Sequence, residues 1–376
     1  MLLLSGPNLN GNELKYVTEC IETGWVSSVG SYVDKFEKMS AEFAGTQYAI
    51  ATSSGTTALH TCLIMLGVNE NDMVIAPNIT FIATLNSIKY TGATPVLIDA
   101  DEKNWQMDLD LLEEFLTNET IQKDGSCYHK KTGKRIPVIM PVHVLGNMCD
   151  MDRLLSLAEK NNITIIEDST EALGSYYKGK HAGSFGLLGT FSYNGNKIIT
   201  TGGGGMIVTN DELLAKRAKH LTTQAKSDPF EYIHDDIGYN YRLVNVAAAM
   251  GVAQMEQLPG FLKRKKEIID FYKNELEGVG DIEFQQVNAD VNPNWWMPTI
   301  KTVKQREVLK ILNDNKMQSR PFWVPMNQLR MFSNEIYYTK TDRSDFLYKH
   351  CLSIPCSTNI TNEDLLSVCK KIKEIY

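Results

Sequence analysis

The chain has 376 residues, of which 43% are hydrophobic and 22% are charged, and its formal net charge is −7. A chain of this length can bury a large core and predicts two or three domains, and its composition is not that of a disordered, fibrous or repeat protein. The negative charge opposes a broad electrostatic hold on nucleic acid, and no stretch approaches the ~20 apolar residues that cross a bilayer. We therefore expect a soluble cytoplasmic protein that binds neither nucleic acid nor membrane.

The cysteines are odd in number and widely scattered. No two of them have the spacing of a metal site, and no short disulfide framework is visible. We expect reduced thiols and no metal site. The apolar N-terminal run at residues 1–4 is too short for a signal peptide and lacks a basic leader. The basic stretch KKTGKR at residues 130–135 is predicted to form a solvated hairpin or loop.

From Tyr48 onward, short apolar runs typical of strands alternate with helical patterns. Strands are predicted at residues 48–52, 73–76, 94–98, 136–141, 163–167, 189–192 and 205–209. Helices are predicted at residues 56–66, 82–90, 109–116 and 151–160. Short apolar strands separated by helices indicate an α/β fold. We expect a mixed, mostly parallel sheet of about seven strands, covered by helices on both faces.

The pattern changes in the last third of the chain. Two helices are predicted, at residues 244–257 and 261–276, and a shorter alternation of strands and helices follows from about residue 281. A loop around residues 287–294 is expected to be exposed. We predict a large domain at residues 1–260 and a smaller C-terminal α+β domain at residues 261–376, rigidly docked because no low-complexity linker separates them.

A run of small and hydroxyl residues, SSGTTAL at residues 53–59, stands between a predicted strand and a predicted helix. The N–H groups at a helix N-terminus carry about half a positive charge and suit a phosphate. Gly55 would let the backbone approach closely, and the hydroxyls of Ser54 and Thr56 could donate as well. A simple helix N-cap explains the same residues, since Ser and Thr are preferred there.

Two acids, Glu167 and Asp168, end a predicted buried strand. Ligands of open α/β sheets bind in the crevice beyond such strand ends. A carboxyl group there could pair with a protonated heterocyclic nitrogen, because a cationic partner favours the carboxylate. An acid after a strand is also a common turn residue, so this feature alone leaves both interpretations open.

One lysine, Lys197, lies between a predicted strand that ends at Ser192 and a glycine run at residues 202–205. Apolar surroundings lower the pKa of a lysine and make its neutral amine available as a nucleophile. Most lysines are solvated surface groups, and the glycine run does not have the spacing of a nucleotide P-loop. A fourth motif, GYNYR at residues 238–242, leads into an alanine-rich helix and by itself indicates only close packing.

Taken together and in this order, the four motifs resemble the fold-type I, aspartate-aminotransferase-like enzymes of the DegT/DnrJ/StrS group, the sugar aminotransferases. The resemblance covers nearly the whole chain, from residues 7–13 and Gly24-Trp25-Val26 to Ser353-Ile354-Pro355. It implies pyridoxal 5′-phosphate as the cofactor. Lys197 matches the lysine that binds the cofactor covalently and moves the proton at the substrate carbon. Asp168 matches the acid that keeps the pyridine nitrogen protonated.

Further residues match the family's cofactor site. The resemblance places Ser54, Gly55 and Thr56 in the phosphate-binding turn and makes Ser192 a further phosphate ligand. Phe81 matches the aromatic residue that stacks on the cofactor ring. Asn240 matches a residue that reaches the phosphate of the neighbouring subunit, which implies a homodimer with active sites shared across the interface.

The chain departs from the family pattern at two places. Glu171 stands where the family usually has Gln beside the cofactor's phenolic oxygen, and an ionised carboxylate would be unfavourable there. Four glycines at residues 202–205 replace the usual Gly-Glu-Gly-Gly. Together with the segments Asn194-Gly195-Asn196-Lys197 and His234-Asp235-Asp236, these variants resemble a branch that uses L-glutamate to aminate UDP-linked 2-acetamido-4-keto-6-deoxy sugars on the way to bacillosamine or legionaminic acid.

Several alternatives stay open. The substrate could instead be a GDP- or dTDP-linked ketosugar, aminated at C4 or C3. A cofactor-dependent sugar deoxygenase or dehydratase of the same fold is less well supported, because one such branch has His in place of Lys197. A nicotinamide-dependent enzyme would need a Gly-x-Gly-x-x-Gly turn that residues 53–57 do not supply. Arg320 and Lys226 are candidates for contact with the substrate's diphosphate.

Overall fold

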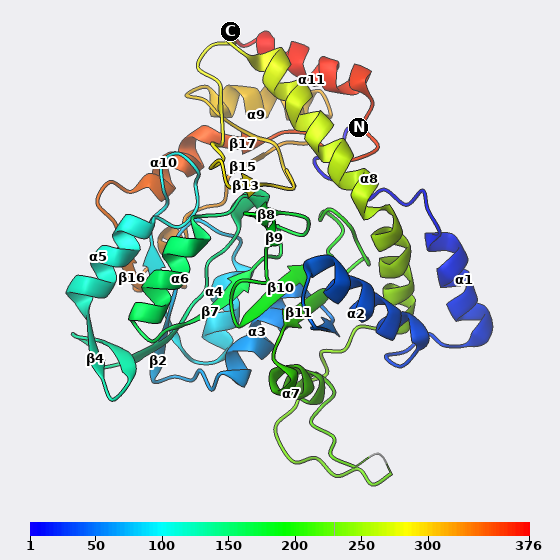
Figure 1. Cartoon of the computed structure of the whole chain (residues 1–376). Coiled ribbons are helices and arrows are strands. Elements are labelled where there is room, and N and C mark those ends of the chain that lie inside the picture. The colour runs from blue at the N-terminus through cyan, green and yellow to red at the C-terminus, as the bar shows by residue number, and fades with distance from the viewer. Residues whose placement is uncertain (229) are drawn as a thin grey trace.

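The structure is a computed structural model that describes residues 1–228 and 230–376. A ten-stranded mixed sheet forms its centre (Figure 1). The strands along the main path are, in spatial order, β1 (Tyr48–Thr52), β11 (Gly205–Thr209), β10 (Leu188–Ser192), β7 (Thr164–Asp168), β6 (Arg135–Ile139), β2 (Asp72–Pro77), β3 (Thr94–Ile98) and β16 (Ile336–Tyr338). Adjacent strands from β10 to β16 are parallel, whereas β11 runs antiparallel to both of its neighbours.

The seven predicted strands are all present, and three further strands join them. The hairpin of β4 (Thr120–Lys123) and β5 (Ser126–His129) pairs with β6 at the sheet's margin and continues into the predicted basic turn. Strand β16 comes from the C-terminal third and pairs in parallel with β3. The expected number of strands was therefore too low, because a three-residue strand and a polar hairpin carry no run of apolar alternation.

Helices cover both faces of this sheet, as expected. Alternate residues of a strand point to opposite faces, and in β2 Met73 and Ile75 pack on one side while Val74 and Ala76 pack on the other. The first side is covered by α5 (Leu109–Glu119) and α6 (Met151–Lys160). The second is covered by α3 (Gly55–Met65), α4 (Ala83–Tyr90) and α7 (Glu212–Thr222).

The C-terminal part contains a small four-stranded sheet in the order β12 (Glu283–Phe284), β14 (Thr299–Lys301), β17 (Cys351–Ser353) and β15 (Arg320–Pro321). Its helices are α9 (Gln305–Asp314), α10 (Arg343–His350) and α11 (Asn362–Lys373). A three-stranded sheet joins β13 (Val291–Asn292) to β8 (Tyr176–Tyr177) and β9 (Lys180–His181). Two 3₁₀ turns, η1 (Val144–Gly146) and η2 (Met326–Gln328), complete the connections.

A single 32-residue helix, α8 (Asn245–Leu276), replaces the two helices predicted for this region. Pro259 lies inside it; proline lacks an N–H donor and clashes with the preceding turn, so it kinks a helix without having to end it. The helix changes direction along its length and rises towards the C-terminal part (Figure 1). The predicted division at residue 260 falls within α8, and the assignment of two domains on either side of it stays a prediction.

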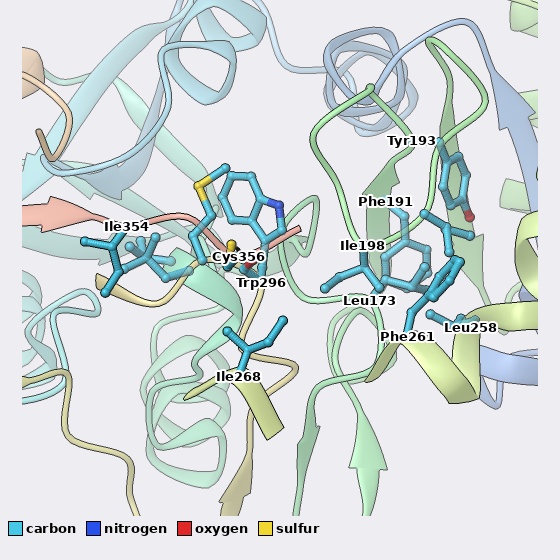
Figure 2. Packing of buried hydrophobic residues seen from close by; sticks show 14 of the residues in the cluster. Leu173, Phe191, Tyr193, Ile198, Leu258, Phe261, Ile268, Trp296, Ile354 and Cys356 are labelled. Atoms are coloured by element: carbon cyan, nitrogen blue, oxygen red, sulfur yellow. Dashed lines mark hydrogen bonds between the residues drawn. The ribbon is translucent and has the colours of Figure 1, made fainter. Parts of the chain in front are cut away.

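The N-terminal helices α1 (Glu13–Thr23) and α2 (Ser31–Ala44) pack against α8. Around α8, a large core joins the central sheet to the C-terminal part. Figure 2 shows a portion of this core, where Leu258 and Phe261 of α8 lie beside Phe191 and Ile198. One continuous apolar core thus supports residues from both predicted domains.

Two other expectations concern loops and thiols. In the loop at residues 287–294, residues 288–290 are exposed, but Val291, Pro293 and Asn294 are buried, so the expectation of an exposed loop was wrong for its second half. All seven cysteines are buried, and none forms a disulfide in the described residues.

Within residues 1–228 and 230–376, no helix combines the length and the apolar character needed to cross a membrane.

Candidate active site

Three neighbouring strands bring the predicted site residues to one edge of the sheet. β7 ends at Asp168, which is paired in register with Thr190 of β10. β10 ends at Ser192, and both Ser192 and the last residue of β1, Thr52, are paired with Gly205 of β11. The chain leaving β1 therefore starts α3 directly beside the ends of β10 and β7, as the strand-end rule for α/β sheets predicts.

A cavity of about 380 Å³ opens at this edge. Seven of the predicted site residues line it, with further residues from the C-terminal part on the opposite wall. The predicted residues in the lining are Ser54, Gly55, Thr56, Phe81, Glu171, Ser192 and Lys197. Residues of the first and third motifs thus meet in one cavity, together with Glu171 shortly after the second, whereas the GYNYR motif at residues 238–242 contributes no side chain to the lining.

Lys197 lies in the loop after β10 with its side chain only 12% exposed. Its Nζ is 3.8 Å from Glu171 Oε1 and 4.0 Å from the centroid of the Trp296 ring. Burial lowers the pKa of the Lys197 amine, and the carboxylates of Glu171 and Asp168 act in the opposite direction. Because the net shift is downward, the neutral, nucleophilic amine is more accessible here than on a solvated lysine.

Glu171 is buried beside Lys197. Its Oε2 accepts a 2.8 Å hydrogen bond from the backbone N–H of Leu145, a residue held at a left-handed φ of 60°. Burial raises the pKa of Glu171 to about 7, although the Lys197 ammonium lowers it. A carboxyl group with this pKa is partly protonated near neutral pH, so the expected conflict between an ionised Glu171 and a phenolate oxygen is reduced.

Asp168 is buried at the end of β7 and does not itself line the cavity, and its carboxylate is fixed by two threonines. Thr84 donates to Oδ2 over 2.7 Å, and Thr170 donates to Oδ1 over 2.7 Å through its hydroxyl group. Its neighbour Glu167 has other partners: it accepts a 2.9 Å hydrogen bond from His143 and further bonds from the backbone N–H groups of Gly183, Phe185 and Gly186. Of the two acids, Asp168 is therefore the one that acts electrostatically on Lys197 and Glu171.

The N-terminus of α3 forms the wall opposite Ser192. Ser54 and Thr57 make a reciprocal capping box, so the N-cap interpretation of this motif is correct. The phosphate interpretation stays a prediction, and the geometry is compatible with it. A Cβ atom on Gly55 would lie 2.9 Å from the Cβ atom of Ser192, so only glycine leaves this narrow space open.

Asn240 and Lys226 do not line the cavity. Asn240 is exposed and belongs to an isolated bridge with Thr223, and Lys226 lies in the projecting segment after α7, with its Nζ 4.5 Å from the Tyr232 ring centroid. Arg320 does line the cavity. Of the two basic candidates, only Arg320 is therefore placed to meet a ligand in this hollow.

Comparison with known proteins decides what kind of site this is. Residues 7–373 match the model of the DegT/DnrJ/EryC1/StrS aminotransferase family. The chain belongs to that family. It is 41% identical over 373 residues to the GDP-perosamine synthase of Escherichia coli O157:H7, with 98% of this chain and 97% of that protein covered.

Further comparisons support the same family. This chain is also 34% identical to the putative pyridoxal phosphate-dependent aminotransferase EpsN of Bacillus subtilis, over 96% of this chain and 92% of EpsN. Its fold matches the PMP form of the putative sugar aminotransferase Spr1654 of Streptococcus pneumoniae with a TM-score of 0.90, at 24% identity, over all of this chain and 99% of the other. The protein is a sugar aminotransferase that depends on pyridoxal phosphate.

The residues of the aminotransferase cavity fit this cofactor. A buried amine can react with an aldehyde, the buried carboxylate of Asp168 acts electrostatically on that amine, and a helix N-terminus with a glycine-lined cradle faces Ser192. These are the groups that bind an aldehyde, a pyridine nitrogen and a phosphate. Bound pyridoxal phosphate supplies the electron sink for transamination.

Sequence reasoning missed several residues of the aminotransferase site. Trp296 lies against Lys197, and its indole N–H donates a 2.7 Å hydrogen bond to the carbonyl of Asn196. Buried Asn294 donates to the Glu171 carbonyl over 2.8 Å. The tryptophan pair after Asn294 was the signal that could have indicated burial, because large aromatic side chains are seldom left in solvent.

Proposed function

We propose that this enzyme transfers the amino group of L-glutamate to the keto carbon of a GDP-linked 4-keto-6-deoxy sugar, for the synthesis of surface glycans. The GDP-perosamine synthase that shares 41% of its residues supports the GDP nucleotide. The UDP-linked acetamido sugar that the sequence pattern favoured has no such support, so the GDP alternative replaces it.

The position of Lys197 is the main observation that supports the proposed transamination. Its amine is buried, has a lowered pKa and lies in the same cavity as the glycine cradle. We propose that Lys197 holds the cofactor covalently at rest. Once its amine is free, it removes the α-proton of glutamate and later delivers a proton to the sugar carbon.

The other site residues would bind the cofactor and the substrate and hold them in position. Asp168, held by Thr84 and Thr170, would keep the pyridine nitrogen protonated. Ser54, Gly55, Thr56 and Ser192 would bind the phosphate, and Phe81, which is 52% exposed, would cover the ring. Arg320 would meet the diphosphate or the carboxylate of a substrate, because it lines the same cavity and guanidinium groups pair well with both anions.

We also propose a homodimer in which Asn240 reaches the cofactor phosphate of the second subunit. Asn240 is exposed and lies outside its own cavity, and the apolar side chains of Ile237 and Val244 on either side of it are 79% and 40% exposed. A second copy of the chain would cover these groups. Sedimentation of the holoenzyme as a monomer at micromolar concentration would contradict this part of the proposal.

The visible absorbance of the holoenzyme tests the function. Glutamate should bleach the cofactor band, and a GDP-linked 4-keto-6-deoxyhexose should restore it. The matched UDP-linked 2-acetamido sugar should restore it much more slowly. A band restored faster by the UDP sugar would reverse the choice of nucleotide.

Two controls separate the reaction from its alternatives. Lys197→Ala should stay folded and lose transamination, and near-normal turnover by this variant would contradict the role of Lys197. The mass of the sugar product distinguishes amination from deoxygenation, because only amination replaces the carbonyl oxygen with an amino group. Nuclear magnetic resonance of the product reports whether C4 or C3 carries the nitrogen.

A further inference from the structure

Lys197 and Glu171 face each other inside the protein. The side chain of Glu171 is 1% exposed and that of Lys197 is 12% exposed, and Nζ and Oε1 are 3.8 Å apart. The other carboxylate oxygen of Glu171 is occupied by the Leu145 N–H. Oε1 is therefore the oxygen turned towards the amine.

Few other charges reach this pair in the described part of the chain. Asp168 faces it from the end of β7 and acts electrostatically on both members. Arg320 stands on the cavity wall contributed by β15. The other close groups are neutral: the Trp296 ring lies against Nζ, and Asn294 donates to the Glu171 backbone carbonyl. The proton distribution of the pair is thus set mainly by its two members and Asp168.

Burial acts on the two groups in opposite directions. It raises the pKa of Glu171 to about 7 and lowers the pKa of Lys197, so each group is driven towards its uncharged form. An ammonium next to a carboxylate and an amine next to a carboxylic acid have the same net charge. In a site shielded from water, the penalty of burying two ions makes the uncharged arrangement accessible.

We infer that Glu171 is the proton-exchange partner of Lys197: it takes the proton that the lysine releases when its amine becomes neutral, and returns it afterwards. In this step an N–H bond of the ammonium breaks and an O–H bond forms at Oε1. No other reactant is needed. The separation of 3.8 Å exceeds a hydrogen bond, so the transfer takes place after a small side-chain approach or through one bridging water.

The inference rests on the proposed role of Lys197 as the proton-moving residue. It gives Glu171 a function beyond contact with the cofactor. A lysine that alternates between nucleophile, base and acid must exchange a proton in each half-reaction, and Glu171 supplies a place for that proton inside the closed site. A glutamine at this position could donate a hydrogen bond but could not store the proton.

The test uses cofactor-free protein and measures how fast it binds pyridoxal phosphate covalently, followed by visible absorbance between pH 5 and 10. Only the neutral amine reacts, so the midpoint of the rate against pH reports Lys197. Glu171→Gln removes the carboxylate that stabilises the ammonium, so the midpoint should move about 1–3 pH units towards acid. The rate at the alkaline plateau should stay within about twofold, since the amine is neutral there in both proteins.

Matched variants separate the possible outcomes. Glu113→Gln, the same change at an exposed ion-paired carboxylate, should leave the midpoint unchanged. Glu171→Asp keeps an acid and should have a midpoint nearer to that of the original protein. A lower plateau with an unmoved midpoint would show a merely structural role for Glu171 and would overturn the inference.

Failure of the proposed function has a different signature. If Lys197→Ala still binds the cofactor with an unchanged visible band, Lys197 is not the reacting amine, whatever Glu171 does. Infrared spectroscopy of the unaltered protein gives a second measurement that depends on no Glu171 variant. A protonated carboxyl band that disappears as the pH rises through about 7, and shifts in Lys197→Met, would support the inference, and a spectrum without such a band would overturn it.

Discussion

Trp296 and Lys197 form one wall of the cavity although 99 positions separate them in the chain: the lysine Nζ lies 4.0 Å from the centroid of the indole ring. The tryptophan is held from two sides. Its indole N–H donates to Asn196, directly before the lysine, and its carbonyl accepts a 2.8 Å hydrogen bond from buried Lys265. Trp296 therefore fixes the loop that carries Lys197.

The first prediction concerns that hydrogen bond. Trp296→Phe keeps an aromatic ring but leaves the Asn196 carbonyl without its indole donor. A lost partner of this kind costs about 1–3 kcal/mol, and we expect the free energy of unfolding in urea to fall by that amount. Trp295→Phe is the matched control, since the Trp295 indole N–H has no hydrogen-bond partner among the described residues. Equal losses in the two variants would contradict the prediction.

A second prediction concerns the support of Asp168. Thr84→Val is nearly isosteric and removes the 2.7 Å hydrogen bond to Oδ2. Hydrogen bonds to charged groups contribute about 1.5–3 kcal/mol, so kcat should fall roughly tenfold or more if Asp168 acts on the cofactor. Thr61→Val, which removes a buried hydroxyl that donates to the Thr57 carbonyl, should leave kcat within about twofold. Steady-state measurement of kcat for both variants tests this prediction, and an equal kcat in the two variants would contradict it.

The third prediction is a loss of stability in acid. His181 is buried; its Nε2 accepts a 2.8 Å hydrogen bond from the Gly174 N–H, and burial lowers its pKa to about 4. The folded protein therefore binds fewer protons than the unfolded chain between pH 6.5 and 4. Neutral His181 therefore contributes fully to the free energy of unfolding above about pH 6.5. This contribution is lost as the pH falls towards 4, and the loss amounts to about 3 kcal/mol.

Urea unfolding of cofactor-free protein checks this prediction. His181→Gln should be less stable at pH 7, because it loses the ring's packing and hydrogen bonding. The difference in unfolding free energy between the original protein and this variant should then shrink as the pH is lowered to 4. A difference that stays constant from pH 7 to pH 4 would show that His181 does not titrate as described.

A fourth prediction concerns the cavity wall from the C-terminal part. Arg320→Gln should raise the KM for the GDP-linked ketosugar roughly tenfold or more, because charge-assisted bonds to phosphate are lost. The bleaching of the cofactor band by glutamate serves as a separate readout and shows whether the donor also depends on Arg320. Arg330→Gln, at an exposed position outside the cavity, is the control. An unchanged KM would exclude Arg320 from substrate binding.

The large sheet and the cofactor motifs were predictable because each depends on neighbouring residues. The alternating apolar runs of β2 and β3 and the strand-to-helix turn at Ser54 leave a local pattern in the sequence. Asp168 could be placed at a ligand crevice because it follows a predicted buried strand of an α/β sheet. These expectations needed no knowledge of distant contacts, whereas Ser192 was assigned to the site by the family resemblance.

The wall formed by Trp296 and Arg320 could not be predicted in this way. It arises from long-range packing of the C-terminal part onto the sheet, and neither residue belongs to a local pattern that indicates a cavity. The continuity of α8 was missed for a related reason: Pro259 predicts a break, whereas packing along both halves holds one bent helix together. The pairing of Glu171 with Lys197 likewise depends on the fold, since the sequence indicates only that the residue is acidic.

The bent helix α8 has a consequence for how the enzyme is made. Gln254, before the bend, accepts a hydrogen bond from the Thr200 N–H near Lys197, and Lys265, after it, donates to the carbonyl of Trp296. A ribosome must therefore release the chain well past Arg320 before the cavity has all its walls. The first 260 residues carry Lys197 and the proposed phosphate turn, yet a nascent or truncated chain of that length would expose Lys197 to water and to free aldehydes.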